Sequence, residues 1–119
     1  EVELAVDGGL TIVASITKVS TNNLGLKPGA AAMALIKASF VLLMNDADKY
    51  LLSTRNQFTG TVSKVTPGAV NAEVIVDLPG GASIASIVTM GSIKNLGLEP
   101  GKKVTAIVKA SQVILAVPK

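Results

Sequence analysis

The chain has 119 residues, of which 49% are hydrophobic and 3% aromatic, and 11 basic against 8 acidic residues give it a formal net charge of +3. It contains no Cys and no His, which removes disulfides, thiolate and imidazole metal ligands, thiol nucleophiles and the commonest general base. We therefore expect a non-enzymatic protein with no metal-cation site, and the mild positive charge favours an anionic partner.

The chain repeats itself. Residues 1–43 recur without a gap as residues 73–115, and 19 of the 43 aligned pairs are identical. The chain is therefore a tandem of one small module. Residues 53–72 precede the second copy and have no counterpart before the first, so we expect a processed or truncated form whose opening strand and turn are absent. We predict a first module over residues 1–50 that lacks this segment and a complete second module over residues 51–119.

The elements are predicted in the same order in both copies. Residues 1–6 and 10–17 flank a Gly-Gly pair and indicate a β-hairpin, which residues 73–78 and 82–89 repeat. A short helical turn follows, for which Ser20 and Ser92 are the expected N-caps and a Gly the expected C-terminal stop. Two strands separated by a bend at an Ala-Ser pair complete each copy, over residues 31–37 and 41–44 and over residues 103–109 and 113–117.

The linking segment and the residues after it complete the second copy. We expect residues 45–50 to form a polar turn. The pattern of residues 60–73 predicts a strand, a Pro-Gly turn and a second strand. Five short strands and one helical turn per complete repeat predict an all-β fold of two OB-like small β-barrels in tandem. Lys37 divides the longest apolar stretch, residues 30–44, into arms too short for a membrane helix, so we expect a cytoplasmic protein.

Several short motifs resemble those of the molybdate-binding Mop (TOBE) domains, and the resemblance covers the whole chain. They are Ser53-Thr54-Arg55-Asn56-Gln57, Gly60-Thr61-Val62, residues 68–74, Thr89, Leu96-Gly97-Leu98 and Lys109-Ala110-Ser111. The tandem is similar to the di-Mop proteins of bacteria, in which the oxyanion rather than a pterin is the ligand. The resemblance implies binding of molybdate or tungstate without a cofactor, a role in cytoplasmic molybdenum storage and homeostasis, and a homotrimer of tandem chains. The family usually opens with Ser-Ala-Arg-Asn, and here the second position is Thr54.

A tetrahedral dianion needs hydrogen-bond donors that converge from several directions and one or two cations to offset its desolvation. The repeated residues supply such hydroxyl, amide and cationic donors. The candidates are Ser53, Thr54, Arg55, Asn56, Thr89, Lys109, Ala110 and Ser111, with Thr17, Lys37, Ala38 and Ser39 in the first repeat. We expect no carboxylate in the pocket, because fully deprotonated molybdate needs donors alone whereas phosphate carries a proton that needs an acceptor. The resemblance implies a second kind of site at oligomer axes, formed by Gly68, Ala69, Val70 and Asn71.

Other interpretations of these residues remain open. Lys37 and Lys109 are also explained as solvated charges at strand ends, Arg55 as a surface ion-pair partner and Asn56 as a turn residue. The chain also fits a molybdate-sensing fragment of a transcription regulator or transporter ATPase. An OB-type nucleic-acid binder is disfavoured because stacking on bases needs aromatic side chains, and the chain has only Phe40, Tyr50 and Phe58.

Overall fold

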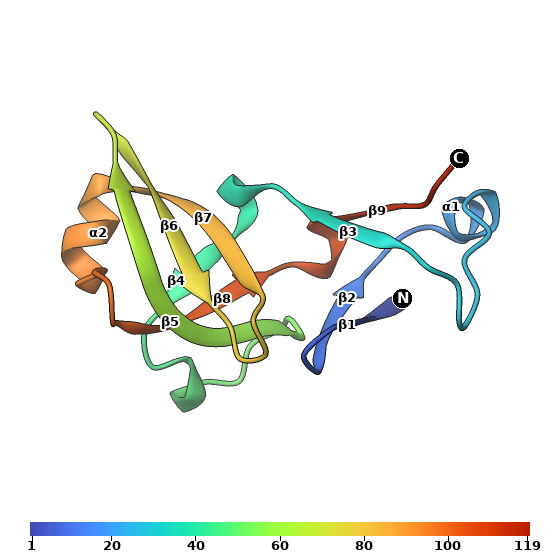
Figure 1. Ribbon diagram of the computed structural model, residues 1–119, viewed down its shortest axis with the longest axis horizontal. Coiled ribbons are helices and arrows are strands. Elements are labelled where there is room, and N and C mark those ends of the chain that lie inside the picture. The colour runs from blue at the N-terminus through green and yellow to red at the C-terminus, as the bar shows by residue number, and fades with distance from the viewer.

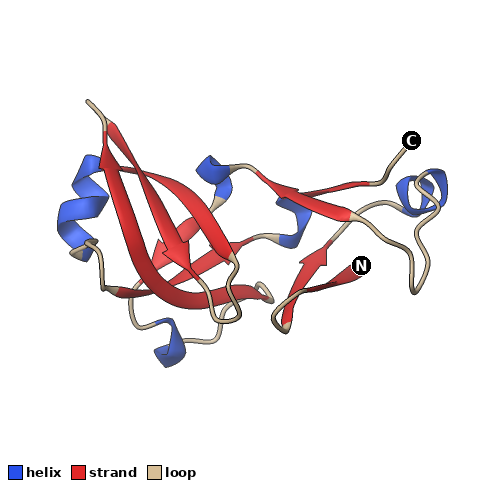
Figure 2. Ribbon diagram, in the orientation of Figure 1, coloured by secondary structure: helices blue, strands red, loops and turns tan.

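The computed structural model describes residues 1–119 in full, and its secondary structure is mostly β (Figures 1 and 2). Of the all-β prediction, a mostly-β chain with two short α-helices is confirmed. The first repeat contains four strands, one α-helix and one 3₁₀ turn: β1 (Val2–Val6), β2 (Leu10–Ala14), α1 (Lys18–Asn23), β3 (Met33–Ile36), η1 (Ala38–Phe40) and β4 (Leu42–Met44). The 3₁₀ turn η2 (Ala47–Lys49) links it to the second repeat, and neither α-helix has the length and apolar character needed to cross a membrane.

The second repeat has the same elements and one additional strand at its start. Its elements are β5 (Asn56–Pro67), β6 (Asn71–Asp77), β7 (Ser83–Thr89), α2 (Met90–Leu96), β8 (Lys103–Val108), η3 (Ala110–Gln112) and β9 (Val113–Ala116). Along β6 the buried Ala72, Val74 and Val76 alternate with exposed or half-buried positions, as the period of a strand with one buried face requires. The predicted hairpins on either side of the Gly-Gly and Pro-Gly turns are confirmed, because β1 pairs with β2, β5 with β6 and β6 with β7, all antiparallel.

The two repeats exchange their last strands. β4 of the first repeat pairs with β8 of the second, and β9 of the second pairs with β3 of the first. One five-stranded sheet with the order β4-β8-β5-β6-β7 results, beside two two-stranded sheets, β1-β2 and β3-β9. Figure 1 shows the consequence: the red C-terminal strand lies among the blue and cyan elements of the first repeat. Each repeat therefore depends on the other for a strand.

The core consists mainly of small aliphatic side chains, as the low aromatic content implied. Thirteen buried residues form one cluster, and Phe58 is its only aromatic member. The cluster joins both repeats, since Ala14 and Val41 of the first lie in it with Val74, Val76 and others of the second. The buried Ser86 hydroxyl adds a polar link, donating a hydrogen bond of 2.6 Å to the Val41 carbonyl just before β4.

The helix caps differ from the sequence prediction. Thr17 and Thr89 are the N-caps of α1 and α2, and their Oγ1 atoms accept hydrogen bonds of 3.1 Å from the backbone N–H groups of Ser20 and Ser92. The prediction that the two serines are N-caps was wrong by three residues, because each helix begins earlier than expected. The predicted Gly at the C-terminal end is confirmed at Gly97, which adopts the left-handed conformation.

The Gly-Gly turns of the two repeats meet where the repeats face each other. Gly8 and Gly80 are repeat equivalents, with φ of 92° and 91°. A Cβ on Gly80 would lie 2.7 Å from the Gly8 Cα, and a Cβ on Gly8 would lie 2.8 Å from the Gly80 carbonyl oxygen. Only glycine fits both the dihedral angle and this approach of two backbones. The repeated Gly-Gly pair is thus a structural contact between the repeats.

Candidate anion-binding site

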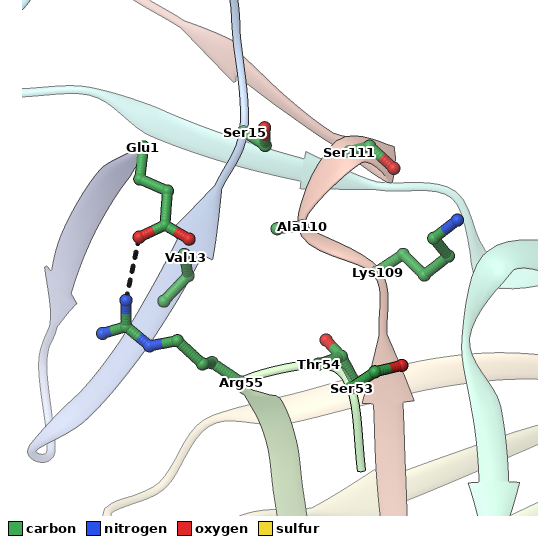
Figure 3. Close-up of a pocket in the computed structure, with 9 residues that line it drawn as sticks. All are labelled: Glu1, Val13, Ser15, Ser53, Thr54, Arg55, Lys109, Ala110 and Ser111. Carbon is green, nitrogen blue, oxygen red and sulfur yellow. Dashed lines mark hydrogen bonds and ion pairs between the residues drawn. The ribbon is translucent and has the colours of Figure 1, made fainter.

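A pocket of about 320 Å³ lies between the two repeats (Figure 3). It is formed by β2 of the first repeat, by the segment that leads into β5, and by the end of β8 with η3. Nine residues line it, and two of them are hydrophobic: Glu1, Val13, Ser15, Ser53, Thr54, Arg55, Lys109, Ala110 and Ser111. Six of the predicted ligands, Ser53 to Arg55 and Lys109 to Ser111, are therefore brought together by the fold.

Backbone contacts fix the shape of this pocket. The Ser15 N–H donates a hydrogen bond of 2.9 Å to the Ala110 carbonyl, which holds η3 against β2. The amide N–H of Arg55 makes no backbone hydrogen bond, and Ala110 and Ser111 are the first two residues of η3, where N–H groups have no partner within the turn. Lys109 is exposed and forms no salt bridge. The pocket wall thus offers free amide donors, the Ser53 and Ser111 hydroxyls and one unpaired ammonium group.

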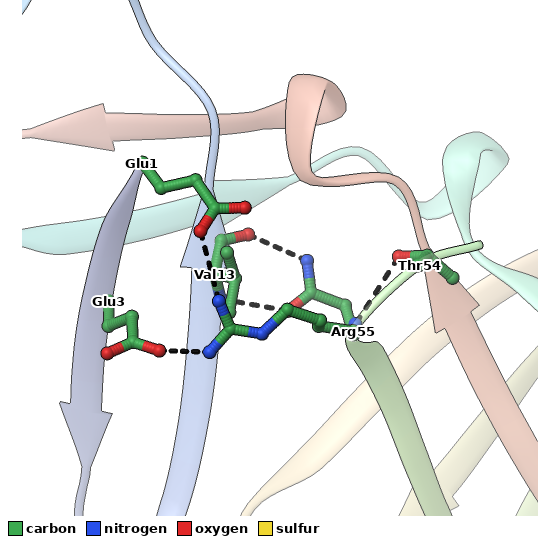
Figure 4. Close-up of polar contacts among 6 residues, drawn as sticks. Glu1, Glu3, Val13, Thr54 and Arg55 are labelled. Carbon is green, nitrogen blue, oxygen red and sulfur yellow. Dashed lines mark hydrogen bonds and ion pairs between the residues drawn. The ribbon is translucent and has the colours of Figure 1, made fainter. Parts of the chain in front are cut away.

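The Arg55 side chain turns away from Lys109 and toward β1 (Figure 4). Its guanidinium forms an ion pair of 3.0 Å with the Glu1 carboxylate and a second ion pair with Glu3. The hydrogen bond to Glu3, with smaller contributions from its charge and from Glu1, raises the pKa of Arg55 above its ordinary value, so the group stays charged. The expectation that no carboxylate belongs to the pocket was wrong, because Glu1 lines it as the partner of Arg55.

Thr54 and Asn56 stabilise the segment around the pocket. The Thr54 hydroxyl donates to the Val108 carbonyl at 2.8 Å and accepts from the Asn56 N–H at 3.3 Å. Asn56 is fully buried, and its side chain accepts from the Val13 N–H at 2.8 Å and donates to the Val13 carbonyl at 2.7 Å. Asn56 was predicted as a ligand, but it does not line the pocket, because its amide is used to clamp the second repeat to β2.

Thr89 was grouped with Lys109 in the prediction, and the structure separates the two. Thr89 caps α2 and lines a second pocket of about 580 Å³, together with Ser39 of the first repeat. The strand exchange explains this arrangement, because η1 packs against β7 before the chain enters β4. Within one chain the candidate donors therefore group across the repeats: β2 and η3 meet at the first pocket, and β7 and η1 at the second.

The remaining first-repeat candidates, Thr17, Lys37 and Ala38, line neither of these two pockets. Thr17 is occupied as the N-cap of α1. The Lys37 ammonium lies over the Phe40 ring, 5.5 Å from its centroid, a contact that the second repeat lacks because Gln112 occupies the equivalent position. Ala38 begins η1, as Ala110 begins η3.

The residues predicted for axis sites form the turn between β5 and β6. This turn is the yellow-green tip in Figure 1, at the far end of the sheet from β1 and β2. The Gly68 N–H donates to the Asn71 carbonyl at 2.8 Å, and the Val70 carbonyl accepts from the Met90 N–H at 2.9 Å. Ala69 lies between them at the tip. Val70 is largely exposed and Asn71 lines the second pocket.

Four pocket or ion-pair residues were not predicted from the sequence: Glu1, Glu3, Val13 and Ser15. Glu1 could have been singled out from the sequence, because it is identical to its repeat equivalent Glu73. Glu3, Val13 and Ser15 could not, since their repeat equivalents are the different residues Ile75, Ala85 and Ile87. They reach the site only because the second repeat packs against the β1-β2 hairpin.

A family model described as the TOBE domain matches residues 1–43 and residues 52–115. The matched ranges include most of the chain and both copies of the repeat. The chain belongs to the TOBE domain family.

Three known proteins are similar to this chain over nearly its full length. The solved structure of the cytoplasmic molybdate-binding protein ModG with molybdate bound has a TM-score of 0.94 and 46% identity, covering 98% of this chain and 82% of ModG. Molybdenum-pterin-binding protein MopA of Rhodobacter capsulatus is 48% identical over 99% of this chain. Molybdenum transport protein ModE of Herbaspirillum seropedicae is 44% identical over 98% of this chain. The chain spans 44% of the length of each of these two curated relatives.

Proposed function

We propose that this chain binds molybdate and tungstate without catalysing a reaction on them, and that it serves molybdenum storage and homeostasis in the cytoplasm. The observation that carries the proposal is the convergence of Lys109, the Ser53 and Ser111 hydroxyls and free backbone amides on one pocket between the repeats. Hydrogen bonds from charged and amide donors offset the desolvation of an oxyanion. The similarity to ModG, a cytoplasmic protein solved with molybdate bound, supports the same ligand here.

Selectivity follows from the donor set. Apart from Glu1, which is paired with Arg55, the side chains lining the pocket offer hydroxyl or cationic donors or are apolar. Molybdate and tungstate are fully deprotonated at neutral pH and are held by donors alone, whereas protonated phosphate needs an acceptor. Sulfate carries the same charge as molybdate but is smaller, so pocket size is the remaining discriminator. We therefore propose similar affinity for molybdate and tungstate and weaker binding of phosphate and sulfate.

We further propose that the chains form a homo-oligomer, a trimer of tandem chains, in which each complete module is an OB-like barrel. Eight of the twelve residues that line the second pocket are hydrophobic, and two of them, Leu42 and Ile87, count among the exposed large apolar residues of the chain. The exposed Val70 lies beside the same pocket, next to Asn71. Exposed apolar side chains around a hollow are typical of protein contact sites. The turn from Gly68 to Asn71 would then lie at the contact and offer the proposed axis sites.

A second candidate function is a molybdate-sensing fragment of a larger protein. The observation in its favour is that the chain spans 44% of the ModE of Herbaspirillum seropedicae, a molybdenum transport protein. The anion site would be the same in both cases, and only the presence of a further domain separates them. Sequencing of the complete gene product distinguishes the two, because a DNA-binding or ATPase domain would favour the sensing role.

The test of the ligand is isothermal titration of the chain with sodium molybdate, tungstate, sulfate and phosphate, with the oligomer mass measured on the same sample. The expected result is tight binding of molybdate and tungstate, with little heat from the other two anions. No heat from any of the four, with a folded chain, would contradict the proposal.

Two matched lysine variants then locate the site. Lys109→Ala removes the unpaired ammonium of the pocket, and we expect a loss of molybdate affinity of about tenfold or more, since charge-assisted hydrogen bonds contribute roughly 1.5–3 kcal/mol. Lys103→Ala removes the same charge from an exposed position on β8 that does not line the pocket. Equal losses in both variants would mean that net charge, rather than this pocket, determines binding.

A further inference from the structure

Gln57 ends the motif Ser53-Thr54-Arg55-Asn56-Gln57, and it does not line the pocket. It is the second residue of β5 and is exposed. Its side-chain Nε2 donates a hydrogen bond of 2.7 Å to the Thr54 carbonyl, and its backbone N–H donates one of 3.0 Å to the Arg55 carbonyl. One residue outside the pocket lining therefore binds both carbonyl oxygens of two residues that line it.

The segment that leads into β5 has few other restraints. Leu51 is fully exposed, and no backbone N–H group from Leu51 to Arg55 donates a hydrogen bond to another backbone group. The Thr54 hydroxyl attaches the segment to the Val108 carbonyl at 2.8 Å, but this bond does not engage a backbone group of the segment itself. The peptide group between Thr54 and Arg55 makes one hydrogen bond, and its partner is the Gln57 side chain.

The orientation of this peptide group decides what the pocket wall presents to an anion. A trans peptide is planar, and its C=O and N–H point in opposite directions. The Thr54 carbonyl points to Gln57, outside the pocket lining, so the Arg55 N–H points the opposite way. A carbonyl oxygen turned toward an oxyanion would repel it, whereas an unpaired N–H group attracts it. The hydrogen bond from Gln57 therefore selects the orientation that favours an anion.

We propose that Gln57 is a positioning residue of the anion site: by binding the Thr54 carbonyl, it directs the Arg55 N–H toward the oxyanion without touching the anion itself. The inference rests on the proposed function. Gln57 fixes the peptide before the anion arrives, so the donor needs no rearrangement and the cost of binding is lower. The Arg55 guanidinium has no part in this role, because it is paired with Glu1 and Glu3.

The test is the substitution Gln57→Met, which keeps the length of the side chain and removes its donor. We expect the affinity for molybdate, measured by calorimetric titration, to fall about tenfold, since a hydrogen bond to a charged group is weakened. Without anion, Tm should change by less than about 3 °C, because the lost bond is exposed to solvent. Thr61→Val, at an exposed position of β5 that does not line the pocket, is the control and should bind as the unmodified chain does. Equal affinity of all three chains, or a loss of affinity accompanied by a large fall of Tm, would overturn the proposal.

The NMR signal of the Arg55 backbone amide is the second measurement, because a general structural effect would not act on this amide in particular. In the unmodified chain, molybdate should move the amide proton resonance downfield and slow its hydrogen exchange, and Gln57→Met should reduce both effects. Molybdate binding that leaves the Arg55 amide unchanged would refute the role of Gln57 while the proposed function stands. An unmodified chain that binds neither molybdate nor tungstate would contradict the proposed function, and the role of Gln57 with it.

Discussion

The Asn56 side chain binds both backbone groups of Val13, at 2.8 Å from its N–H and 2.7 Å from its carbonyl, and so joins the first strand of the second repeat to β2 of the first. Asn56 is fully buried and Val13 is nearly so. A side-chain amide offers one acceptor and two donors, and this geometry imitates the pairing of a neighbouring strand. The clamp lies directly behind the segment that carries Ser53, Thr54 and Arg55, so it also positions the pocket.

Substituting Asn56→Ala should lower the free energy of unfolding by about 2–4 kcal/mol, because two buried backbone groups of Val13 would lose their partners. Thr66→Ala, at an exposed position on the same strand, is the control and should change stability by less than about 0.5 kcal/mol. Urea denaturation of both variants measures the difference. Similar small losses in the two variants would contradict the role of Asn56 as a clamp.

The contact between the Gly-Gly turns predicts a difference between two neighbouring glycines. Gly80 and Gly81 both have positive φ, 91° and 98°, so an alanine at either position is strained by about 1–2 kcal/mol. Only at Gly80 would the new Cβ meet backbone, that of Gly8, whereas nothing lies within 4 Å of a Cβ at Gly81. We expect Gly80→Ala to lower Tm clearly more than Gly81→Ala. Equal decreases of Tm in the two variants would show that the two Gly-Gly turns are not in close contact.

The N-cap role of Thr89 predicts that a hydroxyl, rather than threonine itself, is needed at this position. Thr89→Ala should cost about 1 kcal/mol of stability, because the Ser92 N–H loses its acceptor at the start of α2. Thr89→Ser retains the hydroxyl and should remain within a few tenths of a kcal/mol of the unmodified chain. Denaturant titration of both variants is the measurement, and an equal loss in the two would argue against capping.

The sequence predicted the local structure well because the repeat supplied two independent copies of each pattern. The hairpins around Gly-Gly and Pro-Gly, the two helical turns and the strands on either side of Lys37 and Lys109 all form where the periodicity and the turn residues place them. These features depend on residues close in sequence. The N-caps were misplaced because Thr17 and Ser20 both favour capping, and only the backbone geometry decides between them.

The sequence could not predict which candidate anion-binding residues lie in the same pocket, because the two repeats exchange strands. No periodicity or turn residue indicates that β4 pairs with β8, and only the family resemblance implies that strands are exchanged between modules. This pairing carries Ser39 to the neighbourhood of Thr89 and leaves Lys109 beside Ser15. The ion pairs of Arg55 were unpredictable for the same reason, since Glu1 and Glu3 lie more than fifty positions away. The sequence therefore named six residues that line the first pocket, but it did not show which of the candidates share a pocket.

The two carboxylates beside Arg55 predict how affinity for an oxyanion is limited, provided that the proposed function is correct. Glu1 and Glu3 hold the guanidinium toward β1, and Glu1 adds negative charge at the pocket wall. The double change Glu1→Gln and Glu3→Gln removes repulsion of about 1 kcal/mol or more and releases Arg55, so molybdate should bind at least about fivefold more tightly. Stability should change little, because exposed ion pairs contribute little.

The matched control for this pair is Asp46→Asn with Asp48→Asn, in the exposed turn between the repeats. It changes the net charge by the same amount, neither residue lines the pocket, and asparagine accepts the left-handed backbone of Asp46. Calorimetric titration with molybdate at two salt concentrations compares the two double variants. Tighter binding in the glutamate variant alone shows that Arg55 and its carboxylates act locally on the pocket. An equal gain in the aspartate variant would mean that only the overall charge of the chain matters, and unchanged affinity in both would place the anion outside the reach of Arg55.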